Sequence, residues 1–132
     1  MMNSLDSELK PFLSAVTGKK AYDVIALDVR DLTTIADIFI FCSGTSNRQV
    51  TAIADNIQRL LKKQGIKVLS AEGKSEGQWV LLDYGHIIIH VFLEPVRQFY
   101  DIESIWNDAK KIDIEPFIAS VTEEAEEETD NG

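Results

Sequence analysis

Residues 37–50, DIFIFCSGTSNRQV, decide the fold of this chain. The mostly apolar run 37–42 is rich in branched and aromatic side chains, which predicts a strand buried on both faces. The turn at 43–46 then breaks this strand and opens a helix, because Ser46 and Gln49 have the spacing of a capping box. Apolar residues continue at the helical period until Gly65, namely Val50, Ile53, Ala54, Ile57, Leu60 and Leu61. A buried strand that leads directly into an amphipathic helix is typical of an α/β fold.

Further strands are predicted on both sides of this segment. Residues 23–29 form a second buried run, and a third strand is expected after the helix, at 66–70. Strand, helix and strand in so short a length predict a crossover connection, and hence at least one parallel pair. Residues 79–83 and 87–93 are predicted to form a hairpin around the turn Tyr84-Gly85-His86. We therefore expect one mixed sheet of about five strands.

Helices are predicted at both ends of the sheet region. Ser7 is the expected cap of a first helix, with Pro11 in its first turn. Residues 96–100 and 101–109 are expected to form two short helical pieces, and a weaker apolar pattern at 114–121 indicates a further amphipathic turn. The predicted fold class is a single-domain α/β protein, a mixed sheet with flanking helices.

The composition fits one globular domain of 132 residues, 45% hydrophobic and 27% charged. No apolar run approaches the roughly 20 residues that a membrane helix needs, so no membrane association is expected. The single cysteine, Cys42, excludes an internal disulfide and a thiolate zinc cluster. Because no secretory apolar segment follows the first methionines, we expect a cytoplasmic protein.

The negative charge is concentrated at the C-terminal end. The net charge is −9, and six of the 22 acidic residues lie in the last ten residues of the chain. Residues 1–120 are expected to form the folded domain, with a mildly acidic balance of 16 acids against 13 bases. Residues 121–132 are expected to be a disordered acidic tail. This balance disfavours direct binding to a nucleic-acid backbone and favours a basic protein partner.

One enzymatic function has to be weighed against this composition. The turn 43–46 lies between a strand and a helix N-terminus, where backbone N–H groups can hold an anion, as in nucleotidyltransferases. Such enzymes place two acids one residue apart on a neighbouring strand to hold divalent metal. Here Asp83 is present, but Leu81 stands where its partner should be. We therefore expect no metal site. A small metal-dependent nucleotidyltransferase stays the alternative function.

The strand 79–83 carries the strongest candidate for an interaction site. Trp79, Leu81 and Asp83 share one face of this strand, and Tyr84 follows at the turn. Tryptophan and tyrosine concentrate binding energy at protein interfaces, and a carboxylate suits a basic residue across the contact. The spacing alone leaves open whether this face lies beneath a helix or binds a partner.

Several motifs together carry a resemblance to a known family. They are LDVR at 27–30, ADIF at 36–39, SGTSNRQV at 43–50, WVLLDYG at 79–85, HVF at 90–92, FY at 99–100 and WNDA at 106–109. In order and spacing, from about residue 22 to 109, they resemble the ribosomal silencing factor family, also called Iojap-like. The resemblance implies a fold like that of nucleotidyltransferases without the catalytic acids. It also implies a translation repressor that is not an enzyme and needs no cofactor.

The resemblance further implies a partner and a set of contact residues. The expected partner is the large ribosomal subunit, bound through its protein fourteen so that the small subunit cannot join, and the free protein is expected to be a homodimer. The family's contact motif falls on Trp79, Asp83, Tyr84 and Gly85, and Arg97 and Tyr100 match further family positions. We expect Trp79 and Tyr84 to anchor the contact and Asp83 to pair with a basic residue. The sequence departs from the family pattern at His86, where an acid is more usual.

Overall fold

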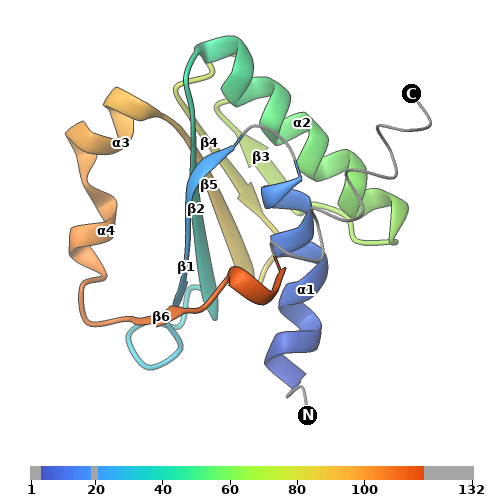
Figure 1. Cartoon of the computed structure of the whole chain (residues 1–132), viewed down its shortest axis with the longest axis vertical. Helices are drawn as coiled ribbons and strands as arrows, with labels where there is room; N and C mark the ends of the chain where they lie inside the picture. Colours follow the sequence, from blue (N-terminus) through green and yellow to red (C-terminus); the bar gives the residue numbers. More distant parts are fainter. Residues whose placement is uncertain (1–3, 19–20, 118–132) are drawn as a thin grey trace.

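The computed structural model describes residues 4–18 and 21–117, which form one mixed sheet between two layers of helices (Figure 1). In chain order, its elements are α1 (Ser4–Thr17), β1 (Tyr22–Asp28), β2 (Ile38–Gly44), α2 (Asn47–Lys63), β3 (Ser70–Glu72), β4 (Trp79–Asp83), β5 (Ile87–Leu93), α3 (Glu94–Tyr100), α4 (Ile102–Ile105) and β6 (Lys110–Ile112). The predicted α/β class and the hairpin at 79–93 are confirmed.

The order of the strands across the sheet is β3-β4-β5-β2-β1-β6. The central strands β2 and β5 are parallel, and every other neighbouring pair in the sheet is antiparallel. The predicted parallel pair is therefore confirmed, but its second member is β5 and not the strand that directly follows α2. The chain between β2 and β5 contains α2 and then β3 and β4, the two outermost strands on one side of the sheet.

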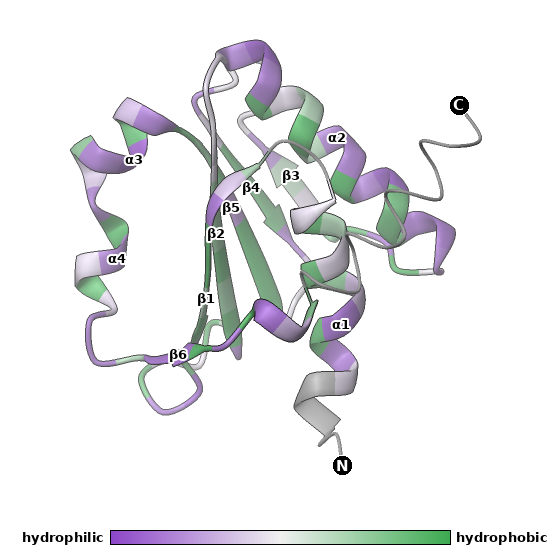
Figure 2. Cartoon of the chain, in the orientation of Figure 1, coloured by the Kyte–Doolittle hydropathy of each residue, from purple (hydrophilic) through white to green (hydrophobic). Residues whose placement is uncertain are grey.

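Each face of the sheet has its own hydrophobic cluster. The first, here called the α1–α2 face, is covered by the helices α1 and α2 and holds Ile38, Ile40, Ile87 and Ile89. The second, the α3–α4 face, lies toward α3 and α4 (Figure 1) and holds aromatic side chains of the same two central strands. Figure 2 shows the central strands as largely hydrophobic, whereas α2 alternates between hydrophobic and hydrophilic residues, as expected of a helix with one buried side.

Both ends of α2 follow the sequence prediction. The Ser46 side chain accepts a hydrogen bond from the Gln49 N–H at 3.1 Å, so Ser46 is the N-cap. Gln49 Oε1 accepts a hydrogen bond from the Thr45 N–H. In a standard capping box it would accept from the N–H of the cap itself, Ser46, which is one residue later. At the other end, Gly65 has φ 80°, and its N–H and that of Ile66 bond to the carbonyls of Lys62 and Leu61. This is a Schellman motif, which explains why a glycine ends the helix.

The sheet has six strands, one more than expected, and one predicted strand is misplaced. The short strand at Lys110–Ile112 was missed because two exposed lysines on an edge strand give no alternating apolar pattern. The expected strand at 66–70 is wrong, since pairing begins only at Ser70. Ile66 and Val68 give the apolar signal there because they pack against the α1–α2 cluster without joining the ladder.

The helix boundaries also needed correction. The first helix begins at Ser4, so Ser7 is not its cap and Pro11 lies inside the helix. The predicted helix at 101–109 is only the single turn α4, which ends at Ile105 before the chain turns into β6. A helical turn begins at 115, but the rest of the segment predicted at 114–121 lies outside the described residues.

Replacing Ser46 by alanine should lower the free energy of unfolding by about 1 kcal/mol, because the Gln49 N–H loses its capping acceptor. Ser46→Asp is the matched control, since it keeps an acceptor at the cap and should change stability little. Urea unfolding followed by circular dichroism measures both variants. An alanine variant as stable as the parent would show that the cap does not hold this helix start.

Candidate interaction site

Trp79 lies at the start of β4 on the α3–α4 face, where it is partly buried. Its ring stacks on Phe92 with a centroid distance of 4.9 Å, because the two residues are paired across β4 and β5. Its indole N–H donates a hydrogen bond to His90 Nδ1 at 3.1 Å. Tyr100 of α3 also packs against it, with a centroid distance of 5.3 Å. Trp79 is therefore fixed by its neighbours and is not fully buried.

The surface around Trp79 continues onto the end of α3. Tyr100 is 52% exposed and Phe99 is 80% exposed, and their rings meet at 5.1 Å. We call Trp79, Phe99 and Tyr100 the aromatic patch. The site prediction included Trp79 and Tyr100 but missed Phe99. Two adjacent aromatic residues at the end of a short helix were the available signal, since both cannot face the core.

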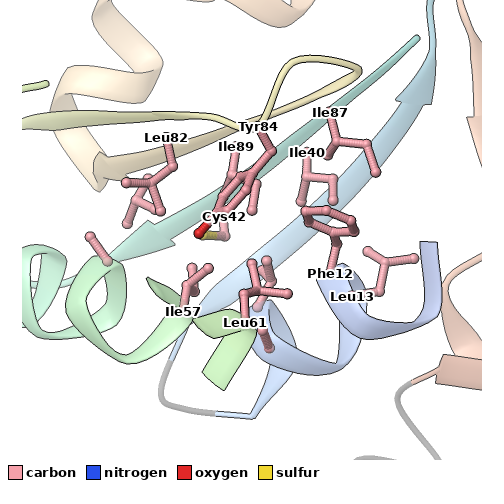
Figure 3. Packing of buried hydrophobic residues seen from close by; sticks show 14 of the residues in the cluster. Phe12, Leu13, Ile40, Cys42, Ile57, Leu61, Leu82, Tyr84, Ile87 and Ile89 are labelled. Carbon is pink, nitrogen blue, oxygen red and sulfur yellow. The ribbon is translucent and has the colours of Figure 1, made fainter. Parts of the chain in front are cut away.

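Tyr84 does not belong to this patch. It is only 7% exposed and points into the α1–α2 face, where its ring meets Phe12 of α1 at 5.2 Å (Figure 3). The expectation that Tyr84 stands beside Trp79 as a surface anchor is wrong in this structure. The physical reason is the two-residue alternation of a strand, which continues into the turn and places residue 84 with Val80 and Leu82.

The hydroxyl of Tyr84 is buried without a hydrogen-bond partner among the described residues. Burial also raises the pKa of this phenol to about 12, because the charged form loses its hydration. A buried hydroxyl without a partner costs stability. Tyr84 therefore contributes its ring to the core and has an unsatisfied polar atom there.

Asp83 and Gly85 shape the turn between β4 and β5. Asp83 Oδ1 accepts a hydrogen bond from the Gly85 N–H at 2.7 Å, and Gly85 has φ 92°, a conformation that favours glycine. Asp83 remains partly exposed on the α3–α4 face, so its carboxylate can still meet a basic residue of a partner. The roles expected of Asp83 and Gly85 in a contact stay predictions.

Arg97 has a structural role that the sequence did not indicate. It is buried, and its guanidinium bonds to both carboxylate oxygens of Glu103, to the Asp23 carbonyl and to Ser43 Oγ, at distances from 2.7 to 3.1 Å. These contacts join α3, α4, β1 and β2, next to a surface cavity of about 400 Å³. The expected use of Arg97 as a partner contact is not supported by this geometry, because the side chain is buried and makes four hydrogen bonds within the chain.

The parts of the alternative nucleotidyltransferase site do not come together. Asp83 pairs with Ile88, which is level with Phe39 on β2. The turn after Gly44 lies at the other end of β2, about 16 Å away along the strand. A carboxylate at that distance cannot share a metal with a phosphate held at the turn. Within residues 4–18 and 21–117, no three metal-ligating side chains are grouped.

His90 is buried in the aromatic cluster of the α3–α4 face. Its ring stacks on Phe41 at 4.8 Å, and Phe39 and Phe92 pack around it. Burial lowers the pKa of His90 to about 4, because the cluster cannot hydrate an imidazolium. The neutral ring accepts the Trp79 N–H, so His90 supports the patch from beneath. Cys42, on the opposite face, is fully buried as predicted, and burial raises its pKa to about 12.

The fold and the site define an α/β domain with exposed aromatic side chains at one end of a doubly covered sheet. The family whose description is "Ribosomal silencing factor during starvation" matches residues 2–132. The chain belongs to this ribosomal silencing factor family, as the sequence resemblance predicted. Membership implies ribosome-associated repression of translation, and the curated names of its relatives identify a regulatory protein.

Relatives and solved structures agree with this assignment. "Ribosomal silencing factor RsfS" of Halalkalibacterium halodurans is 38% identical over 107 residues, which span 81% of this chain and 92% of the relative. The protein of the same name from Bacillus subtilis is 39% identical over 109 residues, spanning 83% and 92% of the two chains. A crystal structure of a Chromobacterium violaceum protein superposes with a TM-score of 0.72 at 39% identity, covering 81% of this chain and 88% of that one. None of the helices described here is long and apolar enough to cross a membrane.

Replacing Tyr84 by phenylalanine should raise the free energy of unfolding by about 1 kcal/mol, because it removes the unsatisfied hydroxyl and keeps the ring. Tyr84→Ala is the contrasting variant and should lower it by about 3 kcal/mol through loss of the packed ring. Chemical unfolding measures both. A phenylalanine variant clearly less stable than the parent would mean that the hydroxyl has a partner.

The stability of the fold should decrease as the pH falls from about 6.5 to about 4. Folded His90 has a depressed pKa, so in this range the unfolded chain binds the proton more readily than the folded chain. Neutral His90 makes its full contribution to the free energy of unfolding above pH 6.5, and roughly 3 kcal/mol of that free energy is lost by pH 4. In His90→Asn an amide oxygen can accept the Trp79 N–H but does not titrate. Urea titrations at several pH values should show a flatter profile for this variant, and equal slopes would exclude His90 as the cause.

Proposed function

We propose that this chain represses translation by binding the large ribosomal subunit through its protein fourteen, so that the small subunit cannot join. Family membership supports the ribosome as the target. The aromatic patch is the observation that carries the contact, since Phe99 and Tyr100 are large, exposed and adjacent to the anchored ring of Trp79. Aromatic residues of this kind dominate the binding energy of protein interfaces.

The patch is suited to a rigid contact with a basic protein. Trp79 is held by Phe92 and His90 before any partner arrives, so little side-chain freedom is lost on binding. Asp83 lies on the same face of β4 and supplies a negative charge at its other end. Residues 1–120 are acidic overall, which favours approach to a basic ribosomal protein.

The mechanism that follows is steric exclusion. A chain of 14.8 kDa seated on the joining face of the large subunit occupies space that the small subunit needs, and no bond is made or broken. The place of action is the cytoplasm, where the subunits join. In the absence of ribosomes, the exposed apolar patch is available for self-association, so we infer that the free protein is a homodimer.

Phe99→Ala and Tyr100→Ala should each weaken binding to purified large subunits by about 2 kcal/mol, roughly thirtyfold in Kd, because each removes an exposed aromatic anchor. These positions are better probes than Trp79, whose truncation would also leave a hole against Phe92. Co-sedimentation over a range of protein concentrations gives the affinities. Binding in competition with protein fourteen alone tests the named partner.

Ile35→Ala is the matched control, since Ile35 is 67% exposed but precedes β2 at the end of the sheet opposite Trp79. It should leave binding unchanged, and Tyr84→Phe should do so as well because residue 84 is buried. If the patch variants keep full affinity while remaining folded, the contact lies elsewhere. If Tyr84→Phe abolishes binding, Tyr84 leaves the core in the complex.

A further inference from the structure

Basic charge is concentrated in one segment of an otherwise acidic chain. Residues 38–71 contain one acid, Asp55, and five bases, which are Arg48, Arg59, Lys62, Lys63 and Lys67. The acid is already paired, because Lys74 Nζ lies 2.9 Å from Asp55 Oδ1. The bases of this segment therefore have no compensating acid within it, although the whole chain carries a net charge of −9.

Three of these bases lie together on the outside of α2. Arg59, Lys62 and Lys63 are exposed, and their i, i+3 and i+4 spacing places them on one side of the last two turns. We call them the α2 basic face. The same turns bury Ile57 and Leu61 on the opposite side, so the basic face points away from the sheet. None of the ion pairs formed within 4–18 and 21–117 includes these three residues.

The described chain ends on the same side of the sheet. Phe117 is buried in the cluster of the α1–α2 face, which also contains Leu61 of α2. Six acids lie beyond it, at Glu123, Glu124, Glu126, Glu127, Glu128 and Asp130. Five residues lie between Phe117 and Glu123, and the six Cα-to-Cα steps from one to the other span up to about 20 Å, more than the 10–12 Å diameter of a helix. The acidic segment is thus long enough to reach the outside of α2.

We propose that the acidic segment 123–130 binds the α2 basic face of its own chain. The charges are opposite, and the tether gives the segment a local concentration in the millimolar range. A separate polyanion such as RNA has no tether, and the net charge of −9 on the chain repels it as it approaches. The bound segment shields the α2 basic face from nucleic-acid phosphates. This proposal does not depend on the ribosomal contact, because the two surfaces lie on opposite faces of the sheet.

A spin label at the end of the chain tests this contact in the full-length protein. In Asn131→Cys the new thiol is the one that reacts, because Cys42 is fully buried with its pKa raised to about 12. At low salt, the label should broaden the amide signals of residues 59–67 at least twofold relative to the reduced label. The broadening should disappear in about 1 M salt, where charges are screened beyond about 3 Å. No broadening of α2 at low salt would overturn the proposal.

Paired charge variants locate the contact. Changing Arg59, Lys62 and Lys63 together to glutamine should remove the broadening, whereas Lys110→Gln with Lys111→Gln, two exposed bases on β6, should leave it intact. Lys19→Gln with Lys20→Gln should also leave it intact. Broadening that survives the α2 variant, or that is lost only in one of the other pairs, assigns the acidic segment to a different surface and overturns the proposal.

Binding of a single-stranded RNA of about 20 nucleotides shows whether the acidic segment or a nucleic acid occupies the α2 basic face. Changing the six acids of the segment to their amides should increase RNA affinity about tenfold at low salt, and adding the α2 changes should abolish the gain. If the unchanged protein binds RNA through Arg59, Lys62 and Lys63 as tightly as the amide variant does, the face is free for RNA and the acidic segment does not occupy it.

Discussion

The parallel pairing of β2 with β5 is the constraint on which the rest of the structure depends. Both strands are buried along nearly their whole length on both faces, so water must be kept from both sides of the sheet. A parallel pair also needs a long crossover, which here carries α2 to one face. The return of the chain after β5 then places α3 and α4 on the other face (Figure 1). The layered fold follows from these two strands.

The alternation of side chains along this pair also divides the chemistry of the two faces. Ile38, Ile40, Ile87 and Ile89 point toward α1 and α2 and build an aliphatic core. Phe39, Phe41 and Phe92 point the other way and build an aromatic core around His90. That aromatic core does not end at the surface, because Trp79 extends it to Tyr100 and Phe99. The proposed contact surface is therefore the exposed continuation of a packed core, which makes it rigid.

The sequence predicted those features that depend on short-range rules. The cap at Ser46, the stop at Gly65 and the hairpin at 79–93 are local, and all three are confirmed. Alternation within β4 could also have placed Tyr84 in the core, had it been continued one residue into the turn. The partners of Arg97 on β1 and β2 could not be predicted, because they lie 74 and 54 residues away along the chain. Strand order and the short edge strand β6 depend on the same kind of long-range contact.

The short motif at 79–85 supplies residues to both faces of the sheet, to the proposed contact surface on one face and to the hydrophobic core on the other. Trp79 and Asp83 point to the α3–α4 face, while Tyr84 closes the opposite core against α1, and Gly85 permits the turn that separates them. A substitution in this motif can therefore change binding, folding or both, depending on which face it reaches. The same separation keeps the α2 basic face away from the aromatic patch, since α2 covers the side of the sheet that Trp79 does not reach. A partner on the patch and the acidic segment on α2 can thus be bound at the same time, without competing for space.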